Sequence, residues 1–229
     1  MSHIGTNNIG KMYLGGIAIG KAYLDSDLVY SSVGGDTPVL PYDAEIEYLQ
    51  STGTQYIDTG ISMSTSLKTE MKAQYTSTSG RTSMALIGAF DTGTTFAVPV
   101  GLQGNGGKLY VQIGSGHALS NATQSSLHTF TSWVSGNAMY LDVDGITVSQ
   151  SGISSFSTRP LYLFARNNAG TAGNIASAKM YYCKLWSGTT LVFDAIPVRV
   201  GTTGYMYDRV SGQLFGNSGT DSFTLGNDK

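Results

Sequence analysis

Residues 140–148 have the sequence Tyr-Leu-Asp-Val-Asp-Gly-Ile-Thr-Val, which predicts a β-hairpin. Apolar Leu141 and Val143 alternate with polar Asp142, as in a strand that buries one face. Asp144-Gly145 follows, and this dipeptide readily adopts the positive φ angles of a two-residue hairpin turn. We therefore expect two antiparallel strands here, with both aspartates on the wet side of the sheet.

The same alternation of short strand and turn continues in both directions from this hairpin. Residues 84–90 and 161–165 are nearly all apolar, which is typical of central buried strands. Residues 176–186 form a long strand candidate, and Ser187-Gly188 predicts its turn. Strand candidates recur about every 8–12 residues, which indicates a sandwich or barrel. The other candidates are 45–49, 55–58, 67–75, 96–102, 109–113, 128–134, 138–143, 146–148 and 190–195, with short closing strands in 204–226.

The composition favours the same fold class. The chain has 229 residues, of which 41% are hydrophobic and only 12% charged, with 30 glycines and 5 prolines. Many Ser, Thr, Gly and Tyr residues suit short strands and tight turns, because branched and aromatic side chains pack on a pleated surface. A helical protein would need more Ala, Leu, Glu and Lys. We therefore predict an all-β protein with one large sandwich domain.

A short repeat precedes this domain. Ile9-Gly10-Lys11-Met12-Tyr13-Leu14 is echoed ten residues later by Ile19-Gly20-Lys21-Ala22-Tyr23-Leu24, and Gly15-Gly16 follows the first copy. With Leu28-Val29-Tyr30 as a third strand, the repeat predicts a small β-meander. A meander of this size buries too little surface to be stable alone, so it must pack against something else.

These features divide the chain into three parts. We expect an attachment segment over 1–33, carried by the repeat residues, and a Gly- and Pro-containing linker over 34–41. The sandwich domain then occupies 42–229. The residues that we expect to mediate attachment are Ile9, Met12, Tyr13, Leu14, Ile19, Tyr23 and Leu24.

The order of these elements resembles the concanavalin A-like, laminin-G-like jelly-roll family. The hairpin of 140–148, the strand of 160–165 and the long strand of 175–186 are similar to successive strands of that family. The opening stretch 48–60 and the closing stretch 205–217 resemble a version found in virions of gut bacteriophages and prophages. The resemblance implies a fibre or decoration protein that is bound to capsid or tail proteins, is present as a homotrimer, and lies on the virion surface after synthesis in the host cytoplasm.

Charge and targeting features exclude several other classes. The net charge is −2 and no basic run is present, so nucleic acid is not an expected partner. No polybasic stretch or long apolar run predicts membrane binding or insertion. The N-terminal residues lack the apolar core of a signal peptide. Cys183 is the one cysteine, which excludes an intramolecular disulfide and suits a reducing compartment.

Catalysis and metal binding have little support in the sequence. The only glutamates are Glu45, Glu47 and Glu70. A glycosidase needs two carboxyl groups on either side of the scissile bond, and Glu45 with Glu47 is more consistent with a solvated strand edge. Asp142 and Asp144 could contribute oxygen ligands to Ca²⁺. A Ca²⁺ site is only a weak alternative, because Ca²⁺ takes six to eight oxygen ligands and two aspartates supply few of them. The three histidines have no zinc-site spacing, so we predict a protein without enzymatic activity or cofactor.

Among possible ligands, the sequence favours glycans. Aromatic platforms and planar polar groups in loops are typical of such sites. The candidates are Asn105, Trp133, Arg166, Asn167 and Asn168. Arg166 to Asn168 follow a buried strand in a polar loop, whereas a core position for Trp133 and turn positions for the asparagines are the alternatives. Three functions stay open: a virion structural protein, a bacterial carbohydrate-binding module and, less favoured, a jelly-roll glycosidase.

Overall fold

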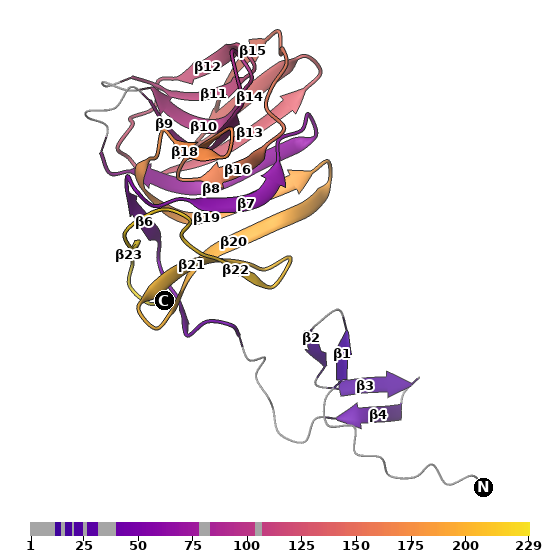
Figure 1. Cartoon of the computed structure of the whole chain (residues 1–229). Coiled ribbons are helices and arrows are strands. Elements are labelled where there is room, and N and C mark those ends of the chain that lie inside the picture. Colours follow the sequence, from indigo (N-terminus) through magenta and orange to yellow (C-terminus); the bar gives the residue numbers. More distant parts are fainter. Residues whose placement is uncertain are drawn as a thin grey trace, which may run out of the picture. The chain divides into compact units, whose positions relative to one another are not determined.

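The structure is a computed structural model of the whole chain (Figure 1). It describes residues 40–77, 83–103 and 107–229, together with four short strands of the N-terminal region for which only the backbone is described. The chain divides into two compact units, Met1–Pro41 and Tyr42–Lys229.

The described part of the N-terminal unit consists of two hairpins. Strand β1 (Met12–Leu14) pairs with β2 (Ile17–Ile19), and β3 (Lys21–Leu24) pairs with β4 (Asp27–Ser31). Both pairs are antiparallel, and Leu14 lies opposite Ile17. The predicted three-stranded arrangement is wrong in this detail, because the first copy of the repeat pairs with the segment directly after Gly15-Gly16 rather than with the second copy. Of the expected attachment residues, Ile9 lies outside the described residues, and the other six lie in β1, β2 and β3.

The larger unit contains two sheets, as Figure 1 shows. Within the described residues, the larger sheet has eleven strands and the smaller sheet eight. The main path of the larger sheet, in spatial order, is β15 (Ile146–Ser151), β14 (Ala138–Val143), β13 (His128–Ser135), β8 (Leu67–Tyr75), β19 (Ser177–Ser187), β20 (Thr190–Val200), β21 (Thr203–Asp208) and β22 (Gln213–Phe215). Its short additional strands are β5 (Ala44–Glu45), β6 (Leu49–Thr52) and β23 (Thr224–Leu225).

The smaller sheet is built in the same way. Its main path is β12 (Gly116–Ser120), β11 (Leu109–Ile113), β10 (Phe96–Gln103), β9 (Ser83–Phe90), β16 (Pro160–Leu163) and β7 (Ile57–Ser62). The hairpin of β17 (Arg166–Asn168) and β18 (Thr171–Gly173) joins this path because β17 pairs with β9. No helix occurs among the described residues, so none of them forms a helix that could span a bilayer.

The hydrophobic core lies between the two sheets and follows strand alternation. In β8, Leu67, Met71, Ala73 and Tyr75 are buried, whereas Lys68 and its alternate neighbours are partly exposed. Side chains of successive strand residues point to opposite faces, so each strand gives one face to the core. Most buried apolar residues of both sheets belong to one contiguous cluster. The predicted all-β sandwich is confirmed.

The 140–148 hairpin has the predicted geometry. Val143 of β14 lies opposite Ile146 of β15, which leaves Asp144 and Gly145 as the two-residue turn. Their φ angles are 53° and 90°, the positive values that the turn requires. Leu141 and Val143 are buried, as expected from the alternation.

Two predicted segments differ from the structure. Residues 166–170, which the sequence suggested as a polar loop, form the β17–β18 hairpin, because Ala169 and Gly170 adopt positive φ angles of 51° and 99° and close a turn. The predicted strand over 45–49 is divided between β5 and β6. Ile46 turns into the core between them and makes an isolated bridge to Asp228, which interrupts the strand.

Candidate functional site

The outer face of the larger sheet carries alternating charged and aromatic side chains. On β8 the outward residues include Lys68, Glu70 and Lys72, because the residues between them are buried. Their cross-strand partners on β19 are Trp186, Lys184 and Tyr182, in that order. Directly opposed side chains in an antiparallel pair lie about 4.5–5.5 Å apart at Cβ, so lysines and aromatic rings adjoin across the two strands.

A β-bulge places two consecutive tyrosines on this face. Met180 pairs with Ala73 and Tyr182 with Lys72, so Tyr181 is an extra residue with no partner on β8. Consecutive residues of a regular strand point to opposite sides, but Tyr181 and Tyr182 are both partly exposed, while Met180 and Cys183 on either side are buried. Bulges commonly redirect side chains in this way.

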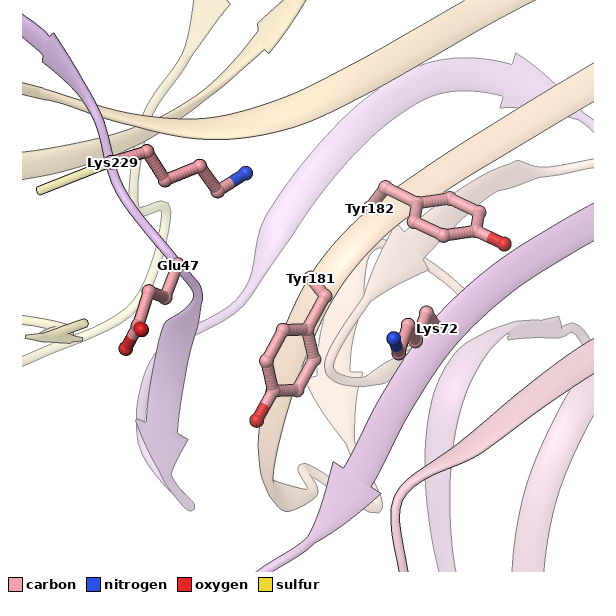
Figure 2. Close-up of a pocket in the computed structure, with 5 residues that line it drawn as sticks. All are labelled: Glu47, Lys72, Tyr181, Tyr182 and Lys229. Atoms are coloured by element: carbon pink, nitrogen blue, oxygen red, sulfur yellow. The ribbon is translucent and has the colours of Figure 1, made fainter. Parts of the chain in front are cut away.

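The bulge borders a pocket of about 450 Å³. It is lined by Glu47, Lys72, Tyr181, Tyr182 and Lys229. Figure 2 shows the phenol ring of Tyr181 in the middle of this group, with Glu47 and Lys229 on one side and Lys72 and Tyr182 on the other. The residues come from four stretches of the chain: the segment between β5 and β6, strand β8, strand β19 and the C-terminal end.

Polar contacts orient the groups at this pocket. The Tyr182 hydroxyl donates a hydrogen bond to Glu70 Oε1 at 3.2 Å. Partial burial and the nearby Glu70 carboxylate raise the pKa of Tyr182, so its hydroxyl stays protonated and able to donate. Asn227 Nδ2 donates to Glu47 Oε2 at 3.4 Å. Both pocket-side carboxylates therefore have a neutral donor as partner.

Cation–π contacts link the lysines to the rings. Lys72 Nζ lies 5.9 Å from the Tyr181 ring centroid, and Lys179 Nζ lies 4.2 Å from that of Tyr48. The Tyr48 and Tyr181 rings are themselves 5.6 Å apart. In such contacts the face of the aromatic ring attracts the ammonium group electrostatically and holds it nearby. The aromatic surface therefore extends from the pocket to Tyr48, directly before β6.

A second aromatic group lies at the other end of β8 and β19. Lys68 Nζ is 4.7 Å from the Trp186 ring, directly across the strand pair. On the two strands beyond β8, Trp133 of β13 stacks on Tyr140 of β14, with ring centroids 5.0 Å apart and planes within 4°. Trp133 was a predicted site residue, and the structure places it on the outer face rather than in the core.

The remaining predicted site residues lie elsewhere. Asn105 is outside the described residues. Arg166, Asn167 and Asn168 form β17 of the smaller sheet, whereas Trp133 belongs to the larger one. The structure therefore places Trp133 apart from the group Arg166–Asn168.

Arg166 is held by its own neighbours. Its guanidinium lies 4.8 Å from the Phe90 ring and 5.1 Å from the Phe96 ring, and its Nε donates to Asn168 Oδ1 at 2.6 Å. Partial burial lowers the pKa of Arg166, and nearby Tyr110 opposes this effect. These contacts describe an arginine packed onto the outer side of the smaller sheet.

Asn167 has a structural role in the hairpin. Its side chain is buried, with 3% exposed surface, and its Nδ2 donates to the Pro160 carbonyl at 2.9 Å. Its Oδ1 accepts from the Gly170 amide at 2.7 Å. Both ends of the amide are occupied, which is the turn-satisfying role that the sequence left open as an alternative.

The two hairpin aspartates also have separate partners. Asp142 accepts from the Gly145 amide and from Thr147 Oγ1, each at 2.8 Å. Asp144 contacts His128 Nδ1 at 2.6 Å and accepts from the Thr129 amide at 2.8 Å. In the part of the chain that the structure describes, no three His, Cys, Asp or Glu side chains lie together as potential metal ligands.

The residues around this pocket were not among the predicted site residues. Tyr181 and Tyr182 were expected within a long strand, without a bulge. The signal was present, because two consecutive tyrosines interrupt an otherwise alternating pattern of apolar and polar residues in 178–186. Glu47 was considered only as a carboxylate for hydrolysis.

Comparisons with known proteins find similarity at the level of structure. No family model matches the sequence, and no curated protein matches it. The fold is similar to that of a Bacteroides ovatus protein to which carbohydrate binding has been provisionally assigned, with a TM-score of 0.51 and 12% identity over 86% of this chain and 65% of that one. Together with the two antiparallel sheets, this likeness shows a concanavalin A-like jelly-roll sandwich, as predicted.

Domains LG4-5 of the mouse laminin α1 chain are a further structural neighbour, with a TM-score of 0.46 and 16% identity over 72% of this chain and 48% of that one. The chain therefore spans less than two thirds of either neighbour. At these identities the likeness establishes the fold alone.

Proposed function

We propose that Tyr42–Lys229 is a non-catalytic module that binds glycans on the outer face of its larger sheet. The observation that carries this proposal is the bulge in β19, which presents Tyr181 and Tyr182 together at a pocket of about 450 Å³. Aromatic rings supply apolar faces for sugar rings, and nearby polar groups fix their orientation through hydrogen bonds. The provisional assignment of the Bacteroides ovatus protein supports the same ligand class.

The polar groups of the pocket suit sugar hydroxyls. Lys72 and Lys229 are donors, Glu47 is an acceptor, and the two phenol hydroxyls can act as either. Together they offer both kinds of hydrogen bond beside an aromatic surface. A ligand rich in hydroxyl groups would use both.

The same pocket argues against glycoside hydrolysis. Hydrolysis by the usual mechanisms needs two carboxyl groups flanking the bond. Among the residues that line the pocket, Glu47 is the one carboxylate side chain, and Glu45 is not part of the lining. We therefore propose binding without turnover.

Binding can be tested with the full chain and an array of purified polysaccharides. Tyr181→Ala and Tyr182→Ala remove the rings at the bulge, and we expect each to weaken binding about tenfold or more, since aromatic contacts with a ligand are commonly worth 1–3 kcal/mol. Tyr56→Ala is a matched control, because Tyr56 stacks on Tyr162 away from this face and the change removes the same ring.

Two measurements accompany the array. Thermal unfolding of each variant separates a lost ligand contact from a lost fold, and a reducing-sugar assay on bound polysaccharides detects turnover. Equal binding by the Tyr181, Tyr182 and Tyr56 variants would contradict the assigned face. Release of reducing ends that depends on Glu45 or Glu47 would show a glycosidase instead.

A second candidate function is the presentation of this module on a virion, and the separate N-terminal unit favours it. Its described strands form two-stranded hairpins, which are at best marginally stable in isolation. Packing against a capsid or tail protein, or against copies of itself in a trimer, would supply the missing buried surface. The protein should then be present in purified phage particles, and its absence from them would exclude this role.

A further inference from the structure

The lysines of the larger unit are concentrated on the proposed binding face. Residues 42–229 contain six lysines: Lys68, Lys72, Lys108, Lys179, Lys184 and Lys229. Four of these lie on the adjoining strands β8 and β19, and Lys229 lines the pocket beside them. Only Lys108 lies elsewhere, next to β11 of the smaller sheet. A domain with few charges has thus placed five of six lysines together.

Among the described residues, none of these five ammonium groups forms a salt bridge with a carboxylate, although Glu70 and Asp194 lie opposite Lys184 on the adjacent strands. Within residues 40–77, 83–103 and 107–229, the ion pairs join arginines or His128 to aspartates, and none involves a lysine. The arginines Arg159, Arg199 and Arg209 are paired in this way. The salt bridges of the described residues therefore use Arg159, Arg199, Arg209 and His128, and leave these five lysines without one.

Aromatic rings hold four of the lysines in place. Lys68, Lys72, Lys179 and Lys184 each lie over the ring of Trp186, Tyr181, Tyr48 and Tyr182, respectively, at 4.2–5.9 Å. A long lysine side chain normally loses considerable rotamer freedom when it binds a ligand. Contact with a ring reduces that loss, because the side chain is already partly ordered.

The lysines are also spaced along the strands. Four consecutive cross-strand rows of outward residues on β8 and β19 each contain one lysine. The rows are Lys68 with Trp186, Lys184 with Glu70, Lys72 with Tyr182, and Lys179 with Gln74. Rows of outward residues are about 6.6 Å apart along a strand. One ammonium group per row over about 20 Å matches an extended chain that carries charges at intervals.

Carboxylates on the same sheet face limit its positive charge. Glu70 accepts from Tyr182, and Glu47 lies at the edge of the pocket. Asp194 on the next strand is neutralised by Arg209 at 2.8 Å. Asp142 lies in the same cross-strand row as Glu70, with Thr131 between them. The five lysines still outnumber Glu47, Glu70 and Asp142, and carboxylates can accept hydrogen bonds from ligand hydroxyls.

We infer that the glycan bound at this face is an acidic polysaccharide, an extended chain whose carboxylate or sulfate groups meet Lys68, Lys72, Lys179 and Lys184. This inference rests on the proposed glycan-binding function and narrows it to one ligand class. Nucleic acid fits less well, because its charge comes from a phosphate at every nucleotide and DNA has no free hydroxyl groups along its chain to donate to the carboxylates of this face. A polysaccharide also has hydroxyl donors for Glu47 and Glu70.

The test compares charged polysaccharides with uncharged counterparts of the same backbone. Polygalacturonate is paired with its methyl ester, and dextran sulfate with dextran, and binding to the full chain is measured by affinity electrophoresis. We expect at least one charged member to bind about tenfold more tightly than its counterpart. We also expect binding to weaken from about 50 mM to about 500 mM NaCl, because salt screens exposed charges.

Substitutions assign the effect to the lysines. The double variant Lys72→Gln with Lys184→Gln should lower affinity for the charged polymer about tenfold, since two exposed charge contacts are lost. Lys108→Gln is the matched control and should leave affinity unchanged. Glu70→Gln keeps an acceptor for Tyr182 but removes a negative charge, so it should strengthen binding, an outcome that an unfolded protein cannot produce.

The outcomes separate the two proposals. Equal binding of charged and uncharged polymers, with loss in Tyr181→Ala but not in the lysine variants, would overturn this inference and support the proposed function. Absence of binding to every polysaccharide would overturn both. Tighter binding of a single-stranded oligonucleotide than of any acidic polysaccharide would also overturn the inference.

Discussion

Asp144 shows how one side chain supports the hairpin at the edge of the larger sheet. Its carboxylate contacts His128 Nδ1 at 2.6 Å and accepts from the Thr129 amide. His128 is buried, and its Nε2 contacts the Thr123 carbonyl at 2.6 Å. The hydrogen bond with His128 lowers the pKa of Asp144. One turn residue thus connects β13, β14 and the loop before β13.

Substitution of Asp144 should have a pH-dependent cost. A carboxyl group whose pKa is lower in the folded state stabilises the protein above its unfolded pKa of about 4 and loses this contribution as pH falls through the folded value. We expect Asp144→Ala to lower the free energy of unfolding by about 1 kcal/mol at pH 7, since the carboxylate is half exposed. Urea unfolding at about pH 7 and about pH 3 measures the change.

Asp144→Asn is the informative control. Asn tolerates the positive φ of 53° at this position and keeps an acceptor, so its cost should be smaller than that of Ala. The loss in Asp144→Ala should shrink at low pH. A loss of the same size at both pH values would show that the charge of Asp144 does not contribute.

Gly101 of β10 is required by the close approach of a neighbouring ring. A Cβ atom at this position would lie 2.5 Å from Cζ of Tyr110, which is itself buried with 5% exposed surface. Gly101→Ala should therefore destabilise the fold by about 1–3 kcal/mol through overpacking. Thermal or urea unfolding checks this value.

A double variant identifies the cause at Gly101. Tyr110→Leu removes the ring atoms that the new methyl group would meet, so the added cost of Gly101→Ala should fall in that background. Costs that simply add would mean that the strain has another source.

At the scale of elements, the bulge in β19 connects fold and site. It lies where the second edge of β19 changes partner, from β6 at Ser177–Met180 to β20 from Cys183 onward. The extra residue allows both halves of β19 to keep their pairing with β8. The same residue creates the pair of tyrosines at the pocket.

Deletion of one tyrosine at 181–182 should remove the pocket without removing the fold. Met180, the remaining tyrosine and Cys183 would then alternate inward, outward and inward, and their pairing with Ala73, Lys72 and Met71 would be continuous. We expect the free energy of unfolding to fall by about 1–3 kcal/mol, because the parts of β19 that pair with β6 and β20 would be one residue closer together. We also expect glycan binding to be lost. Circular dichroism and the polysaccharide array test both effects.

Deletion of Lys184 provides the contrast. It would turn Leu185, which is fully buried, to the solvent side and Trp186 to the core side, since a shift of one residue reverses the faces of a strand. This variant should not fold. If both deletions gave the same result, the bulge would not be a separable feature of the strand.

At the scale of the whole molecule, the division into Met1–Pro41 and Tyr42–Lys229 indicates that the larger unit is stable without the smaller one. The larger unit has its own contiguous core, so a protein of residues 42–229 should unfold cooperatively at nearly the same temperature as the full chain. Differential scanning calorimetry of both proteins compares the midpoints. A large fall in the midpoint would mean that the N-terminal unit is needed for the fold of the larger unit.

The same two proteins test the role of the N-terminal unit in assembly. If the two-stranded hairpins self-associate, the solution mass of the full chain should correspond to several subunits. The protein of residues 42–229 should instead have the mass of a monomer. Light scattering measures this difference. Equal association by both proteins would place the interface on the larger unit instead.

The sequence alone determined the all-β fold, the 140–148 hairpin and the buried strands, because strand alternation and Asp-Gly turns depend on residues that are close together in the chain. It also identified Cys183 as a core residue. The tertiary structure decided the site. Glu47, Lys72, Tyr181 and Lys229 are far apart in sequence, and Tyr181 faces the pocket only because β19 changes partners there. Pairing between distant strands, rather than local pattern, therefore set which side chains meet.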